Sequence, residues 1–166
     1  VDLCNEISLD CNFNDLQFIS KDIRDFSAEE IDVIIALHAC DTATDLAIYK
    51  GINANAKLIV CAPCCHKQVR KDMGSKSQFK ALTKHGVFEE RQAEMLTDTI
   101  RSLLMEREGF KTKVFEFISN EHTRKNVMMV GHNTNSKKNR AKINDEVKQL
   151  KDSFNIQRHE LEDLLS

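Results

Sequence analysis

Two short polar segments of this 166-residue chain, 38–41 and 61–67, carry most of the side chains that could do chemistry. Both hold cysteine, and each also holds a histidine. Thiolates, imidazoles and carboxylates act as nucleophiles, proton acceptors or metal ligands. Each segment follows an apolar run without alternation, which is typical of a strand in a parallel sheet. Because such sheets bind ligands at the carboxyl ends of their strands, the pattern predicts one site at that edge.

The second segment reads Cys61-Ala-Pro-Cys64-Cys65-His66, and its spacing alone suggests a metal site. A structural zinc ion needs four ligands, and no second Cys-x-x-Cys completes the set. Cys61 also belongs to the apolar run, where a thiol packs as a small apolar side chain. We therefore predict neither a structural zinc ion nor a disulfide at Cys61, Cys64 and Cys65. A metal-binding module remains the alternative.

The first segment begins with His38, which ends an otherwise apolar run. An imidazole there is costly unless it is hydrogen-bonded. It is either a base or substrate anchor, or a hydrogen-bonded core histidine. Asp41 reads as a helix cap or loop residue, while Thr42 and Asp45 have the spacing of a capping box.

The order of the predicted elements favours an α/β fold with a mostly parallel sheet. The link between the last two strands is too short for a helical crossover, so the final strand must be antiparallel. A third polar segment, 21–23, follows the first predicted strand and is expected at the same edge. The expected strands are 16–20, 33–38, 58–62, 113–119 and 126–131, and the main helices 1–11, 43–49, 89–108 and a tail from 143.

Composition excludes several classes of protein. Hydrophobic residues make up 41% and charged residues 30%, with a formal net charge of -2, which is an ordinary globular balance. No apolar run approaches the roughly 20 residues that span a bilayer. The cysteines read as reduced thiols, which favours a cytoplasmic protein.

The two polar segments carry a family resemblance. Leu37 to Asp45 (LHACDTATD) resembles the LHACG…TD segment after the fourth strand of a class I S-adenosylmethionine-dependent methyltransferase domain family. Ala62 to Lys67 (APCCHK) resembles that family's PCC-H-K segment after the fifth strand. A tRNA ribose methyltransferase is a more distant likeness. The resemblance covers about residues 1–132, and 133–166 reads as a polar linker with an amphipathic helical tail.

The resemblance implies a Rossmann-like sheet with helices on both faces, and S-adenosylmethionine as the cofactor. It implies that Asp22 accepts a hydrogen bond from the adenine, that Ile23 packs on the ring, and that His38 lies near the methyl group. The implied catalytic set is His38, Asp41, Cys64, Cys65 and His66.

The chain departs from the family in one respect. It has five isolated glycines and no Gly-x-Gly-x-Gly loop to hold the cofactor. We therefore expect the C-terminal portion of a domain without its first strands, binding cofactor poorly alone. A non-catalytic binding or scaffold domain is the alternative. The exposed edge is expected to mediate self-association or to receive the strand 16–20.

RNA is the methyl acceptor that the family analogy and a set of basic residues suggest. The usual meaning of such a set is a solvated surface. Its members are Lys67, Arg70, Lys71, Lys76, Lys80, Lys84, Lys137, Lys138, Arg140 and Lys142.

Overall fold

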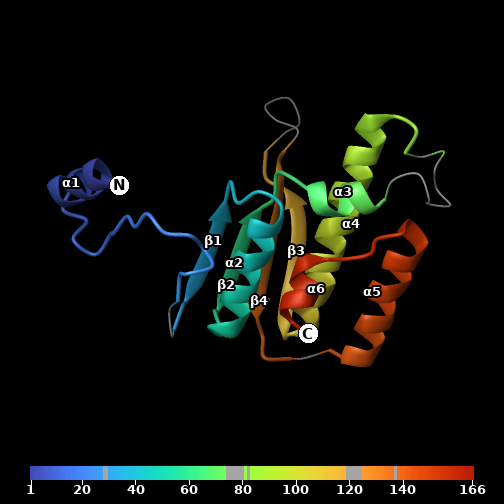
Figure 1. Cartoon of the computed structure of the whole chain (residues 1–166). Coiled ribbons are helices and arrows are strands. Elements are labelled where there is room, and N and C mark those ends of the chain that lie inside the picture. Colours follow the sequence, from blue (N-terminus) through green and yellow to red (C-terminus); the bar gives the residue numbers. More distant parts are fainter. Residues whose placement is uncertain (28–29, 74–80, 82, 119–124, 137) are drawn as a thin grey trace.

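The computed structural model describes residues 1–27, 30–73, 81, 83–118, 125–136 and 138–166. It places helices around one four-stranded sheet (Figure 1). None of the helices in these residues is both long and apolar enough to cross a membrane. The elements are α1 (Asp2–Asp10), β1 (Val33–Leu37), α2 (Thr42–Asn53), β2 (Leu58–Ala62), α3 (Lys67–Asp72), α4 (Gly86–Arg107), β3 (Phe110–Glu116), β4 (Val127–Asn133), α5 (Arg140–Phe154) and α6 (Glu160–Leu164).

The strand order across the sheet is β1-β2-β4-β3. β1 and β2 are parallel, whereas β4 lies antiparallel to both of its neighbours, β2 and β3. β1, β2 and β3 therefore run in one direction and only the final strand is reversed. The predicted α/β class, with its mostly parallel sheet and antiparallel final strand, is confirmed.

One face of the sheet is covered by α2 and α4. The register places Ile34, Ile59 and Gly131 in one row, so these positions share a face. A Cβ at Gly51 of α2 would lie 2.8 Å from the Ile59 side chain, and one at Gly131 would lie 2.0 Å from Met105 of α4. Both glycines thus allow a helix and the same face of the sheet to approach closely.

The opposite face carries exposed apolar side chains. Ile35 is 63% exposed and Leu37 is 56% exposed, although both lie within β1. The resemblance implied helices on both faces, but the described helices that contact the sheet pack on one. An apolar run without alternation favours a strand with helices packed on both faces. Whether helices pack on both faces depends on other elements of the chain and not on the run itself.

The core extends into the C-terminal helices. α5 packs against α4, and α6 packs against α2 and α4. Ile143, Val147 and Leu161 from these helices join the same buried cluster as Ile59 and Ile100. The predicted amphipathic tail therefore covers part of the helical layer. The domain boundary at residue 132 stays a prediction.

The predicted strand at 16–20 is wrong. This segment has no strand partner, and its backbone instead meets α1, where Asn5 accepts from Phe18 N at 2.7 Å and donates to Phe18 O at 3.0 Å. α1 and the segment after it lie beside the sheet without joining it (Figure 1). Within the described residues, β1 pairs only with β2, so the expected insertion of 16–20 beside β1 is also wrong. An extended segment forms a strand only when a neighbouring strand makes hydrogen bonds with its backbone N–H and C=O groups.

Candidate functional site

The loops after β1 and β2 leave the sheet side by side. The parallel register pairs Leu37 with Ala62, the last residues of the two strands. The segments that follow, 38–41 and 63–66, therefore meet at the carboxyl edge of the sheet, where open parallel sheets bind ligands. The structure brings together two of the three polar segments that were expected there.

The loop after β1 has an uncommon backbone. His38 and Asp41 have φ values of 58° and 55°, which non-glycine residues rarely adopt. Asp41 precedes α2 without a side-chain cap, because its Oδ1 accepts from the Gln68 backbone N–H at 3.1 Å. That bond ties the first loop to α3. His38 is exposed, so it is not the buried imidazole that its place in the sequence suggested.

Arg101 of α4 is fully buried, and it binds the same loop from the helical layer. Its guanidinium pairs with Asp45 at 2.8 Å and Asp98 at 3.0 Å, and donates to the Asp41 carbonyl at 2.9 Å. Asp45 is therefore an ion-pair partner and does not serve a capping box. Burial disfavours the charged guanidinium, but the two carboxylates outweigh it, so the pKa of Arg101 is raised. This network fixes the site loop to the helical layer.

His66 lies in the interior rather than on the wall of an open pocket. Its side chain is 2% exposed, and Nε2 is 3.4 Å from Asp98 Oδ1. Neither ring nitrogen makes a hydrogen bond with the described residues, and the same holds for Asp98 Oδ2. Buried polar atoms usually have hydrogen-bond partners, so the contact between His66 and Asp98 is the main polar interaction of this ring in the interior.

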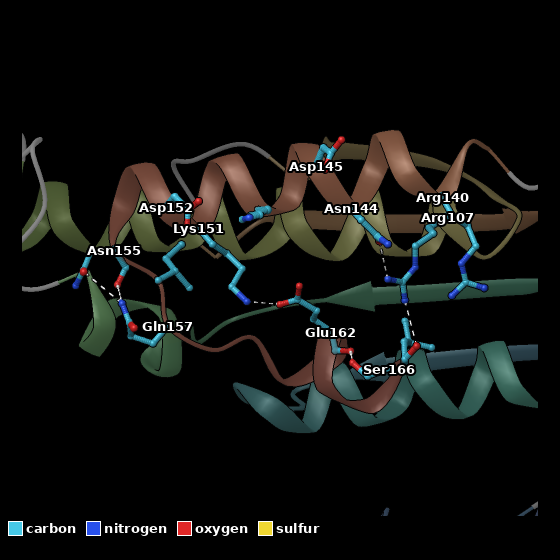
Figure 2. A pocket seen from close by; sticks show the side chains of 13 residues that line it. Arg107, Arg140, Asn144, Asp145, Lys151, Asp152, Asn155, Gln157, Glu162 and Ser166 are labelled. Atoms are coloured by element: carbon cyan, nitrogen blue, oxygen red, sulfur yellow. Dashed lines mark hydrogen bonds and ion pairs between the residues drawn. The ribbon is translucent and has the colours of Figure 1, made fainter.

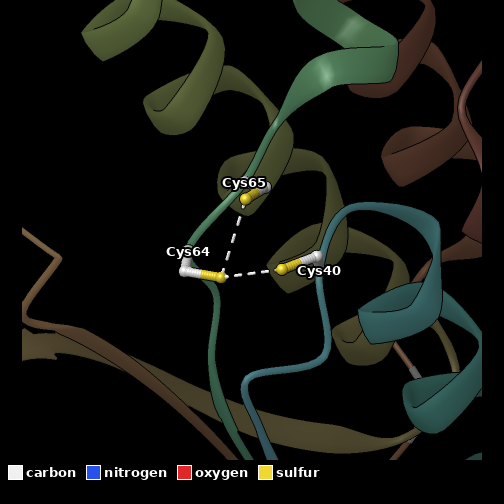
Figure 3. A group of neighbouring side chains, drawn as sticks. All are labelled: Cys40, Cys64 and Cys65. Carbon is white, nitrogen blue, oxygen red and sulfur yellow. Dashed lines mark hydrogen bonds between the residues drawn. The ribbon is translucent and has the colours of Figure 1, made fainter.

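Three thiols from the two loops lie close together (Figure 3). Cys40 Sγ is 3.3 Å from Cys64 Sγ, which is 3.7 Å from Cys65 Sγ. Cys40 is exposed and the other two are half-buried, and all are free thiols. Cys61 is buried in β2 and takes no part in the group. The spacing in the sequence grouped Cys64 with Cys61 and not with Cys40, although parallel pairing of the two strands is the signal that places Cys40 beside Cys64.

The thiols differ in their tendency to ionise. Hydrogen bonds from Cys64 and then Cys65 lower the pKa of Cys40, because they stabilise its thiolate. The same bond to Cys40 raises the pKa of Cys64, with burial adding to the effect. Burial alone accounts for most of the rise that takes the pKa of Cys61 to about 12. Cys40 is thus the thiol of the group that ionises most readily, and Cys61 ionises least readily.

Residues 1–72 match the family model of a methyltransferase domain. The predicted resemblance to a methyltransferase family is confirmed over this range, which contains β1, β2 and both loops and ends with α3. It spans 72 of the 166 residues. The comparisons with curated proteins and with solved structures found no match.

The residues that the resemblance placed at the adenine, Asp22 and Ile23, do not lie at the cysteine loops. Asp22 is paired with Arg24 at 2.7 Å, and that hydrogen bond holds the Asp22 pKa well below its usual range. Ile23 is half-buried against the core. Lys50 donates to the carbonyls of Arg24 and Phe26, at 2.9 Å and 2.6 Å. Lys50 lies eight residues, about 12 Å along α2, from the loop after β1. The structure does not bring the third polar segment to the cysteines.

Much of the basic set is already paired with acidic side chains. Arg70 bonds to Glu89 at 3.2 Å and also to Glu90. Lys67 and Lys71 of α3 are exposed and show no ion pair among the described residues. Lys76, Lys80 and Lys137 lie outside the described residues. Three more ion pairs join Lys138 to Glu106, Arg140 to Glu108 and Lys142 to Glu146.

Two cavities lie away from the loops. One of about 710 Å³ opens between α5 and α6 (Figure 2). Two of its cations are engaged: Arg107 donates to Asn144 at 3.0 Å, and Lys151 pairs with Glu162. The other, of about 760 Å³, lies between α4 and the strands β3 and β4. Neither is lined by His38 or the three cysteines, so neither changes the location of the candidate site.

Proposed function

We propose that this chain supplies the acceptor side of an S-adenosylmethionine-dependent methyltransferase. One observation carries the proposal: the stretch that matches a methyltransferase family contains both loops at the carboxyl edge of β1 and β2. Methyl transfer depends mainly on proximity and alignment, with a base only where the acceptor must lose a proton. A site with no acid–base triad suits that chemistry.

The proposed roles follow from exposure. His38, being exposed at the end of β1, is the group that can accept a proton from an acceptor or hold it. Cys64 and Cys65 form the neighbouring wall. Asp41 and His66 are positioning residues, since Asp41 is bound to α3 and His66 is buried beside Asp98.

The residues of this chain do not by themselves fit S-adenosylmethionine. The cofactor supplies an electrophilic methyl group, and its close approach to the backbone needs a glycine-rich loop, which the 166 residues lack. The Asp22 carboxylate, expected at the adenine, is occupied by Arg24. We therefore propose that the cradle is completed by residues outside this chain, and that the chain alone is inactive.

Calorimetric titration tests this division. The 166-residue chain is expected to show no specific S-adenosylmethionine binding, whereas a longer natural protein that contains it binds. Micromolar binding by the chain alone would contradict the proposed division. In the longer protein, replacing a general base at His38→Ala should lower the methyl-transfer rate about 10²- to 10⁴-fold. His132→Ala is the matched control, an exposed histidine that pairs with the opposite end of β2.

RNA is the proposed acceptor class, supported by exposed Lys67 and Lys71 directly after the cysteine loop. Phosphate contacts make binding salt-dependent, so Lys67→Ala with Lys71→Ala should weaken RNA binding and reduce the salt slope. Lys142→Ala, whose cation is paired with Glu146, is the control. A labelled methyl group that is transferred to protein, in a product that resists nuclease, would show that the acceptor is not RNA.

A scaffold domain is the second candidate, favoured by the missing glycine loop. It predicts no methyl transfer even in the longer protein. A cytoplasmic location is proposed from the six free cysteines and is tested by cell fractionation.

A further inference from the structure

The donor set above the buried Arg101 network consists only of sulfur. Cys40 comes from the loop after β1, and Cys64 and Cys65 come from the loop after β2, yet their three sulfur atoms lie within 4.8 Å of one another. We propose that these three cysteines bind a thiophilic d¹⁰ cation, Zn²⁺ in particular, with a fourth coordination position open to solvent.

The spacing of the sulfur atoms suits such an ion. A zinc–sulfur bond of about 2.3 Å in tetrahedral geometry places two ligand sulfurs about 3.8 Å apart. Two of the observed separations, 3.3 Å and 3.7 Å, lie just below that value. The three thiols lie close together (Figure 3), and the exposure of Cys40 leaves a path for the ion to enter.

The loops are held in place before any ion binds. Asp41, next to Cys40, is tied to α3 through Gln68 and to α4 through Arg101. The Thr44 hydroxyl donates to the carbonyl of Ala39, on the other side of Cys40. Pre-organisation of this kind lowers the cost of assembling a metal site, because few groups must be ordered on binding.

The chemistry of the donors selects the ion. Thiolates favour Zn²⁺ and Cu⁺, whereas Mg²⁺ and Ca²⁺ prefer oxygen, and no carboxylate belongs to the cluster. The earlier objection concerned a four-ligand structural site that included Cys61. Three protein ligands with an open position are instead typical of catalytic zinc. His66, the nearest imidazole in sequence, is turned to Asp98 in the interior.

The inference goes beyond the proposed function and does not depend on it. The whole 166-residue chain, reduced with a phosphine and freed of metal, is titrated with Co²⁺ and then with Zn²⁺. We expect one equivalent of Co²⁺ to bind with sulfur-to-cobalt charge-transfer absorption and to be displaced by Zn²⁺. Mg²⁺ should produce no change. Methyl transfer is not measured, so its failure would leave this result unaffected.

Single variants locate the site. Cys40→Ser, Cys64→Ser and Cys65→Ser should each weaken Zn²⁺ binding by more than the roughly 10- to 100-fold expected for an outer-shell partner. Cys4→Ser removes an exposed thiol of α1 and should leave affinity unchanged. Circular dichroism checks the fold of each variant, and exposed Cys40 keeps the test valid if a half-buried position does not tolerate serine.

Three results would overturn the proposal. The first is no stoichiometric binding by the reduced chain. The second is binding that survives Cys40→Ser, and the third is binding that is lost in Cys4→Ser. A reduced chain that binds no metal but forms a Cys40–Cys64 disulfide on mild oxidation, located by peptide mass spectrometry, would identify a redox-active dithiol instead, and would equally overturn the metal site.

Discussion

The two faces of the sheet differ sharply, although the same strands form both. In β1, Ala36 is 7% exposed on the helix side, whereas its neighbour Ile35 is 63% exposed on the other. In β2, Ile59 is completely buried under α2. Successive residues of a strand point to opposite faces, so a shift of one position separates the core from solvent. The covered face carries the stability and holds the site loops, and the open face contributes little to either.

The buried cation on the covered side provides the largest expected effect. Arg101→Ala leaves Asp45 and Asp98 buried without their counter-charge, and breaking such a pair costs about 3–5 kcal/mol. Urea unfolding measures the loss. Arg158→Ala, which removes an exposed ion pair with Glu160 and Asp163, is the control and should cause no measurable change. Equal stability of the two variants would show that the network does not support the fold.

A matched pair of isoleucines compares the two faces directly. Ile59→Ala should lower the free energy of unfolding by about 2–5 kcal/mol, because it opens a cavity under α2. Ile35→Ala should change it by no more than about 0.5 kcal/mol, since an exposed side chain loses little. A large cost at Ile35 would mean that the open face is covered in solution. Denaturant midpoints are measured at several protein concentrations, because a face covered by a second copy makes the midpoint depend on concentration, whereas an open face does not.

Self-association tests the same open side. β1 is an outer strand of the sheet, and its unpaired backbone is a template for another chain. We predict concentration-dependent association in analytical ultracentrifugation, reduced by Ile35→Lys because a charge on an edge strand opposes pairing. Met95→Lys alters an equally exposed apolar side chain on α4 and is the control. A chain that remains monomeric at every concentration would contradict the prediction.

The sequence predicted the local elements well and the long-range contacts poorly. The strands at 33–37 and 58–62 and the reversed last strand follow from apolar runs and from a short link. The strand at 16–20 depended on a partner that the segment itself does not specify. Asp45 and Arg101 are 56 residues apart, and no spacing rule reports such a pair.

The site shows the same limit. The two cysteine-bearing segments were identified, and their meeting follows from parallel strands. The inclusion of Cys40 depended on combining these two observations. The exposure of His38 and the burial of His66 could not be predicted, because both lie in loops after the strands, where the alternation of a strand no longer decides the direction of a side chain.

The smallest expected effect concerns the ionisation of Cys40, which lies in the loop after β1 at the carboxyl edge of the sheet. The thiolate is the form that is alkylated. Its pKa is lowered, so the thiolate forms at a lower pH than that of an ordinary cysteine, about 8.5. In metal-free reduced protein, the iodoacetamide rate at Cys40, followed by peptide mass spectrometry, should therefore reach half its maximum at a lower pH than it does in an unstructured cysteine peptide. Cys64→Ala removes the thiol whose hydrogen bond contributes most, and should move the midpoint upward. An unchanged midpoint in Cys64→Ala would mean that the two thiols do not interact in solution, and the grouping of Cys40 with the second loop would fail.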